Sequence, residues 1–142
     1  MNREYITAQV GDSRAYCVNG ELHQLTEDQS LIAQEIKAGR LSPKEAKHDR
    51  RRNIILQCVG ASKQLRVAYR WGKVVENDVF FLCSDGFVHE LEDEEIEAFF
   101  RPALLEDQAS IKRSLKDAVA LVKKRGEKDN VTVVLIRVRK AT

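Results

Sequence analysis

Residues 80–86 read Phe-Phe-Leu-Cys-Ser-Asp-Gly, an apolar run that stops at a carboxylate followed by glycine. The apolar residues predict a buried strand, which places Asp85 at the rim of a sheet with a backbone hinge behind it. A metal or phosphate site can be built at such a rim. Two more aspartates, Asp12 and Asp129, also stand next to apolar strand-like runs. We therefore expect the three carboxylates to converge.

The bulk composition predicts one soluble globular domain spanning residues 1–142. The chain is 43% hydrophobic and 32% charged, and no apolar run approaches the ~20 residues that cross a bilayer. The N-terminus has no signal-peptide pattern, so we expect a cytoplasmic protein without a membrane partner. The net charge of +2 and the short basic run at residues 47–52 are too little for a nucleic-acid interface, so no nucleic-acid partner is expected.

The three cysteines, Cys17, Cys58 and Cys83, predict neither a disulfide framework nor a zinc site. Their number is odd, they are widely spaced, and no Cys-x-x-Cys pair occurs. Each lies beside apolar residues, so all three are expected to be small core side chains.

The N-terminal region predicts three strands. Residues 5–10 and 14–18 have strand composition, and Asn19-Gly20 separates the second run from a third at residues 21–25. An Asn-Gly pair in this position predicts a hairpin with a type I′ turn, in which both central residues have positive φ. We therefore expect residues 5–25 to form an antiparallel meander.

Residues 26–53 have the pattern of a small polar, helical insertion between strands. Several N-cap residue types occur at 26–30, and apolar residues follow at helical spacing up to Gly39. Ser42 followed by proline repeats the start signal and predicts a second short helix.

The remaining pattern completes an α+β fold, a layered sandwich of largely antiparallel β-sheet covered by helices. The final strand is apolar on both faces, which predicts a central strand covered on both sides. The expected elements are strands at 54–59, 65–71 and 79–83, helices at 91–100 and 107–124, and a strand at 131–136.

The chemistry of the three aspartates favours a hard divalent cation. A single aspartate at a strand end is commonly a turn former, because its side chain caps nearby backbone amides. Three together offer the carboxylate oxygens that Mg²⁺ and Mn²⁺ prefer. Such a centre performs metal-assisted hydrolysis by activating a bound water.

Four segments, in this order, resemble successive motifs of the metal-dependent protein serine/threonine phosphatases of the protein phosphatase 2C type, most closely the bacterial members. They are Val-Gly-Asp-Ser-Arg-Ala-Tyr at 10–16, Leu-Thr-Glu-Asp-Gln-Ser-Leu at 25–31, Leu-Cys-Ser-Asp-Gly at 82–86 and Asp-Asn-Val-Thr at 129–132. The match runs from about Tyr5 to the C-terminus, and it implies the second half of that family's αββα fold.

The resemblance implies roles for individual residues. Asp85 and Asp129 match ligands of a dinuclear Mg²⁺ or Mn²⁺ centre, which makes them the candidate catalytic residues. Asp12 matches an aspartate that holds a third metal with the Ser-Asp-Gly carboxylate in bacterial members. Gly86 matches the tight turn that presents Asp85, whereas Arg14 is expected to serve strand packing.

Residues 39–60 resemble the flap that lies beside the active site in this family. The candidate flap residues are Ser42, Glu45, His48 and Asn53. Gln29 stands where the family often has histidine. The three histidines of the chain have no metal-ligand spacing and are expected to be surface or capping residues.

The sequence also departs from the family. The family's N-terminal half supplies a phosphate-binding arginine, an Asn-Glu-Asp type motif and an Asp-Gly-x-Gly-Gly motif whose aspartate bridges two metals, and residues 1–142 contain none of these. We expect the C-terminal part of a phosphatase for phosphoserine and phosphothreonine proteins, inactive or weak alone. The alternative is a non-catalytic regulatory or protein-binding module. Open sheet edges would also favour a homodimer.

Overall fold

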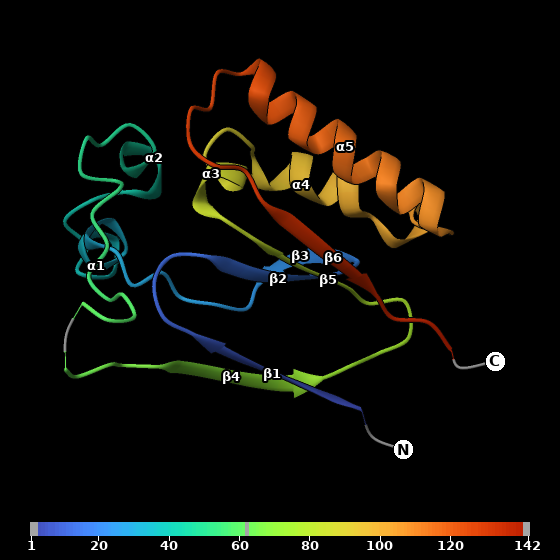
Figure 1. Ribbon diagram of the computed structural model, residues 1–142, viewed down its shortest axis with the longest axis horizontal. Helices are drawn as coiled ribbons and strands as arrows, with labels where there is room; N and C mark the ends of the chain where they lie inside the picture. The colour runs from blue at the N-terminus through green and yellow to red at the C-terminus, as the bar shows by residue number, and fades with distance from the viewer. Residues whose placement is uncertain (1–2, 62, 141–142) are drawn as a thin grey trace.

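Two antiparallel sheets stack face to face, and helices cover the outer face of the larger sheet (Figure 1). The computed structural model describes residues 3–61 and 63–140, so Met1 of the predicted 1–142 domain lies outside the described residues. The strands are β1 (Glu4–Gln9), β2 (Arg14–Asn19), β3 (Glu21–Gln24), β4 (Ala68–Lys73), β5 (Val79–Cys83) and β6 (Val133–Arg137). The helices are α1 (Leu31–Lys37), α2 (Pro43–Ala46), α3 (Asp85–Val88), α4 (Asp93–Phe100) and α5 (Gln108–Lys124), with a 3₁₀ turn η1 (Pro102–Leu104).

The larger sheet has the order β3-β2-β5-β6. The two faces of its strand β5 contribute side chains to two separate hydrophobic cores. Phe81 is fully buried on the helix side, where its ring lies 4.8 Å from those of Tyr16 and Phe100. Its neighbour Phe80 points to the other face, where it contacts Tyr5 of β1 at a ring distance of 5.2 Å. This alternation is that of a strand between two covered faces. The predicted α+β sandwich is confirmed.

The predicted meander of residues 5–25 is wrong in its first strand. β1 pairs with β4 in a separate two-stranded sheet, with Glu4 opposite Lys73 and Gln9 opposite Ala68. Gly11, at φ 106°, lies in the irregular segment that carries the chain from one sheet to the other. Because the chain changes sheets there, β1 and β2 cannot be hydrogen-bonded neighbours.

The β2–β3 hairpin is confirmed, but its predicted type I′ turn is wrong. Gly20 has φ 77°, whereas Asn19 keeps a negative φ and pairs with Glu21 as the last residue of β2. Only one left-handed residue is needed, because the strands remain paired up to the residues that flank Gly20.

Two further strand predictions are corrected. Residues 54–59 form only an isolated bridge, between Ile55 and Ser30, instead of a strand. Their backbone bonds to the start of α1: Leu31 N–H donates to Ile54 O at 2.9 Å, and Leu56 N–H donates to Gln29 O at 2.7 Å. Within the described chain, β6 pairs only with β5 and is therefore an edge strand. Its Val134 and Ile136 are more than half exposed, so the predicted covering of both faces is wrong.

Helices α2 and α5 each begin with a side-chain cap. Ser42 caps α2 through a reciprocal capping box with Glu45, and Asp107 caps α5 in the same way with Ser110. The apolar side of α5 packs on the larger sheet, in agreement with the predicted covering of the sheet by helices. Among residues 3–61 and 63–140, no helix has the length and apolarity needed to cross a membrane.

The cysteines differ in accessibility, which corrects the prediction that all three are core residues. Cys17 and Cys83 are buried, but Cys58 is exposed because it lies in the irregular segment after α2. Burial raises the pKa of Cys17 to about 11 and that of Cys83 to about 12.

One of the three thiols is therefore expected to react quickly with a disulfide reagent in the folded chain at pH 8. A thiol with a pKa near 11 is only about 0.1% thiolate at that pH, and the buried positions also exclude the reagent. A DTNB assay should release one equivalent rapidly and two more after denaturation. Rapid release of two or three equivalents from the folded chain would contradict these burial assignments.

Candidate metal centre

Asp85 lies where β5 ends, at the first position of α3. Ser84 ties this point to the loop before β6: its Oγ donates to Asn130 O at 3.0 Å and accepts from Thr132 N–H at 3.1 Å. Oδ1 of Asp85 accepts from the N–H of Gly86 at 2.8 Å. The N–H of Gly86, at the start of α3, thus orients the Asp85 carboxylate. This carboxylate lies next to the loop that contains Asp129.

Gly86 allows the two aspartate loops to approach each other closely. A Cβ at this position would lie 2.6 Å from Asn130 O and 3.3 Å from Cβ of Asp129. The expected tight turn at Gly86 is instead the first turn of α3, with no positive φ. Glycine is required here by the close contact, because any side chain would push the loops apart.

Asp12 lies near enough to Asp85 for their charges to interact. Burial raises the pKa of Asp12, and the neighbouring carboxylate of Asp85 raises it further. The structure therefore brings Asp12 toward Asp85, and Asp129 toward Gly86, at the same end of the sandwich.

The turn that carries Asp12 is clamped by two glutamines. Gln29 N–H donates to Gly11 O at 2.9 Å, and its Oε1 accepts from Gly11 N–H at 2.8 Å. Nε2 of Gln29 donates to Arg66 O at 2.8 Å, while buried Gln9 bonds to Gly11 O and Ser13 O. Gln29 thus uses both ends of its amide at the position where the resemblance expects histidine.

Arg14 packs within the sheet, as predicted. Its guanidinium forms a fork with Asp28, with Nη2 at 2.7 Å from Oδ2, and Nη1 donates to the Tyr16 hydroxyl at 2.9 Å. This fork joins β2 to the start of the insertion, one residue before Gln29. Its role is to hold the insertion against the aspartate end of the sheet.

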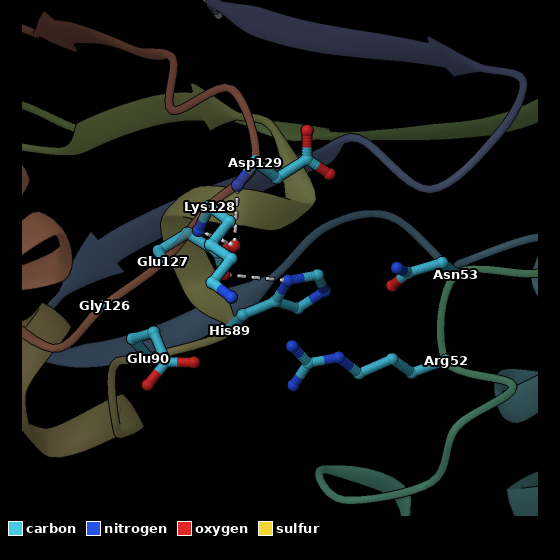
Figure 2. A pocket seen from close by; sticks show the side chains of 8 residues that line it. All are labelled: Arg52, Asn53, His89, Glu90, Gly126, Glu127, Lys128 and Asp129. Carbon is cyan, nitrogen blue, oxygen red and sulfur yellow. Dashed lines mark hydrogen bonds and ion pairs between the residues drawn. The ribbon is translucent and has the colours of Figure 1, made fainter.

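A hollow of about 540 Å³ opens beside these loops, and we call it the His89 hollow. Three segments line it, as Figure 2 shows: Arg52 and Asn53, then His89 and Glu90, then Gly126 to Asp129. It therefore joins the predicted insertion to the Asp85 and Asp129 loops.

His89 is a site residue that sequence reasoning missed. Its Nδ1 lies 3.2 Å from Oε2 of Glu127, and its Nε2 lies 3.8 Å from Oδ2 of Asp85. Burial alone raises the pKa of Glu127, but the N–H donors of Asp129 and Lys128, together with His89, lower it overall. The only sequence signal was the spacing of four residues from Asp85 to His89, which places both on one helical face.

The structure places the four predicted flap residues in different parts of the insertion. Asn53 lines the His89 hollow, whereas Ser42 and Glu45 form the exposed capping box of α2. His48 lines a different, open hollow beside α2. Only Asn53 of the four is brought next to the aspartate loops.

The residues of this end fit part of a divalent-cation site. All three candidate donors are carboxylates, the ligand type that hard divalent cations prefer, and Asp12 and Asp85 lie close enough for their charges to interact. Across the part of the chain that the structure describes, however, no group of three His, Cys, Asp or Glu side chains is close enough to hold a metal ion. The described residues therefore supply an incomplete ligand set.

Comparison with known proteins identifies the class to which this fold corresponds. No family model matches the chain. Its structural relatives are bacterial phosphatases of the protein phosphatase 2C type, and the chain has the fold of a C-terminal portion of their domain. The predicted resemblance is thereby confirmed.

Particular relatives are named as serine/threonine phosphatases. The serine/threonine phosphatase stp of Listeria welshimeri is 31% identical over 134 residues, which are 94% of this chain and 51% of that protein. The solved structure of the S. agalactiae serine/threonine phosphatase is 31% identical with a TM-score of 0.81, covering 96% of this chain and 55% of that one. The chain thus spans about half the length of the curated relatives it matches.

A third relative was solved with metal. The catalytic domain of the serine/threonine protein phosphatase PstP, in complex with two manganese ions, is 27% identical with a TM-score of 0.78. It covers 96% of this chain, and this chain covers 54% of it.

Proposed function

We propose that the chain is the C-terminal part of a metal-dependent phosphoprotein phosphatase that hydrolyses phosphoserine and phosphothreonine. The observation that carries this proposal is the meeting of the Asp12, Asp85 and Asp129 segments at one end of a phosphatase-like fold. The relatives described above are named as serine/threonine phosphatases, which supports the reaction class.

In this proposal Asp85 and Asp129 hold the catalytic cation, and Asp12 holds a further cation together with Asp85. Bound Mg²⁺ or Mn²⁺ would supply a metal-activated water and stabilise charge on a phosphoryl oxygen. Gly86 keeps the two ligand loops together, and Gln29 keeps the Asp12 turn in place. The insertion at residues 26–53 would serve as the flap, and the cytoplasm would be the site of action.

The 142-residue chain alone is expected to turn over little or no p-nitrophenyl phosphate with Mn²⁺. Two cations about 3.5–4 Å apart need a bridging negative group between them, and residues 1–142 contain no Asp-Gly-x-Gly-Gly motif to supply the bridging aspartate. Adding a polypeptide that contains the missing Asp-Gly-x-Gly-Gly motif should produce metal-dependent turnover, measured as p-nitrophenolate release.

The control is the Asp85→Asn variant in the same complemented assay, which should stay inactive because the amide carries no charge for the cation. Steady turnover by the unmodified chain alone would refute its predicted inactivity. Failure of every complemented mixture, with the chain folded, would favour the non-catalytic binding module.

Self-association through exposed apolar strands is a second part of the proposal. Ile6 and Trp71 pair on the outer face of the β1–β4 sheet and are about three-quarters exposed, and no described helix covers that face (Figure 1). Leu82, Val134 and Ile136 are also half exposed, and the β6 edge is open to pairing.

The chain is therefore expected to dimerise at high concentration, with a mass near twice 16.2 kDa by light scattering. A Val134→Lys variant should shift the equilibrium toward monomer, because a charge on this strand opposes pairing. A monomeric mass for the unmodified chain at high concentration would refute the proposal.

A further inference from the structure

The tip of the β2–β3 hairpin, at Asn19 and Gly20, is exposed and unconstrained by hydrogen bonds. Strand β2 runs away from the Asp12 turn, so this tip lies at the opposite end of the larger sheet from the candidate metal centre. Within the described chain, neither the side-chain amide of Asn19 nor the backbone N–H of Gly20 forms a hydrogen bond. A Cβ at Gly20 would meet no atom within 4 Å, so the space around the tip is open.

An asparagine followed by glycine can lose ammonia by closing a five-membered ring with the next backbone nitrogen. At this tip the nitrogen of Gly20 would attack Cγ of Asn19 and lose its proton, while the bond from Cγ to Nδ2 breaks and Nδ2 leaves as ammonia. Water then opens the cyclic imide at one of its two carbonyl groups, which leaves aspartate or isoaspartate at position 19. Glycine favours the first step because it has no side chain to crowd the ring.

The other described asparagines are equally exposed, but the residue that follows each of them is less suited to ring closure. They are Asn53, Asn77 and Asn130. The N–H that follows each of the first two already donates to a backbone oxygen, at 3.0 Å from Ile54 and at 3.2 Å from Asp78. Asn130 is followed by Val131, whose branched side chain crowds the ring. Exposure alone therefore does not single out Asn19, whereas its following residue does.

We propose that Asn19 is a site of spontaneous deamidation in the folded chain, and that the product weakens the β2–β3 hairpin. Asn19 pairs directly with Glu21, so deamidation places two carboxylates opposite each other across the hairpin. Like charges at such positions destabilise the pairing of strands. Isoaspartate also adds one carbon to the main chain, which disturbs the register of the two strands.

The weakened hairpin would affect the larger core. Strand β3 is an edge strand with β2 as its one neighbour in the described sheet, and its Leu22 packs against the core on the helix side. Loss of pairing at the tip therefore loosens part of the cover of that core. The inference does not depend on the proposed metal centre, because none of these residues belongs to it.

The test is to keep the folded chain at pH 8, digest samples over time and measure each asparagine peptide by mass spectrometry. Chromatography separates the aspartate and isoaspartate products. Position 19 should convert at least about tenfold faster than the other three described asparagines. Asn19→Gln should not convert at this position, because its longer side chain would have to close a larger ring. Conversion at position 19 that is no faster than at the other three, or that occurs only in urea-unfolded chain, would overturn the site.

Urea unfolding tests the effect on the hairpin. The aged chain and the Asn19→Asp variant should both unfold at a lower urea concentration than the fresh chain, whereas aged Asn19→Gln should unfold where fresh Asn19→Gln does. In a Glu21→Gln background, Asn19→Asp should have a smaller effect, because the opposing charge is absent. Equal midpoints for the aged and fresh unmodified chains would overturn the proposed weakening, and an equal effect of Asn19→Asp with and without Glu21 would overturn its electrostatic cause.

Discussion

Phe81→Ala is expected to lower the free energy of unfolding by about 3–5 kcal/mol. The ring is fully buried and contacts Tyr16, Phe87 and Phe100, so its removal leaves a cavity between the larger sheet and its helices. Native domains have about 5–15 kcal/mol of stability, so this loss is a large part of the total. The measurement is urea unfolding followed by far-UV circular dichroism, because the single Trp71 is exposed and reports poorly on this core.

Leu82→Ala is the matched control on the same strand. Leu82 is about half exposed on the opposite face, so its truncation should cost less than about 1 kcal/mol. Comparable losses in the two variants would contradict the assignment of β5 faces. A large loss in Leu82→Ala at high chain concentration alone would indicate that this face is covered by another copy.

Local signals in the sequence were sufficient for much of the fold. The hairpin around Gly20, the capped helices and the apolar run before Asp85 all depend on residues close together in the chain, so their patterns predict them directly. The expected packing role of Arg14 is also confirmed, but its partner Asp28 lies 14 residues further along the chain and was not predicted.

The incorrect predictions depend on which segments meet in space. Residues 54–59 have the composition of a strand, but their backbone bonds to the start of the insertion instead of a sheet. The apolar pattern of β6 predicts cover on both faces, and the described chain covers only one. Composition records what a strand can pack against, whereas the presence of a neighbour depends on the rest of the fold.

The same distinction between local signals and contacts in space applies to the residues of the candidate site. The three aspartates were identified because each stands at the end of a strand-like run. This feature alone predicts that all three lie at one rim of the sandwich. His89, Glu127 and Arg52 come from separate segments and have no shared motif, so only the structure brings them to one hollow. Whether the aspartates bind metal stays a prediction, and the contact between their loops gives it a direct test.

Gly86→Ala is expected to weaken Mn²⁺ binding at least about tenfold and to destabilise the chain by about 1–3 kcal/mol. The added methyl would lie 2.6 Å from Asn130 O, and a backbone oxygen held by Ser84 cannot move away cheaply. The Asp129 loop must therefore shift away from Asp85, which separates the two proposed ligands. Binding is measured from the free Mn²⁺ signal in electron paramagnetic resonance, and stability from urea unfolding.

Gly72→Ala separates this effect from a general response to added volume. Its methyl would meet the Tyr5 ring, with the hydroxyl at 2.6 Å and Cε1 and Cζ at 2.7 Å, so this variant also introduces a clash and should also lose stability. Because Gly72 lies on β4, away from the aspartate loops, this variant should nevertheless keep its Mn²⁺ affinity. If both variants bind Mn²⁺ as the unmodified chain does, the closeness of the Asp85 and Asp129 loops does not govern metal binding. If both lose it, the loss follows from general destabilisation, and the proposed ligand pair has no support from this experiment.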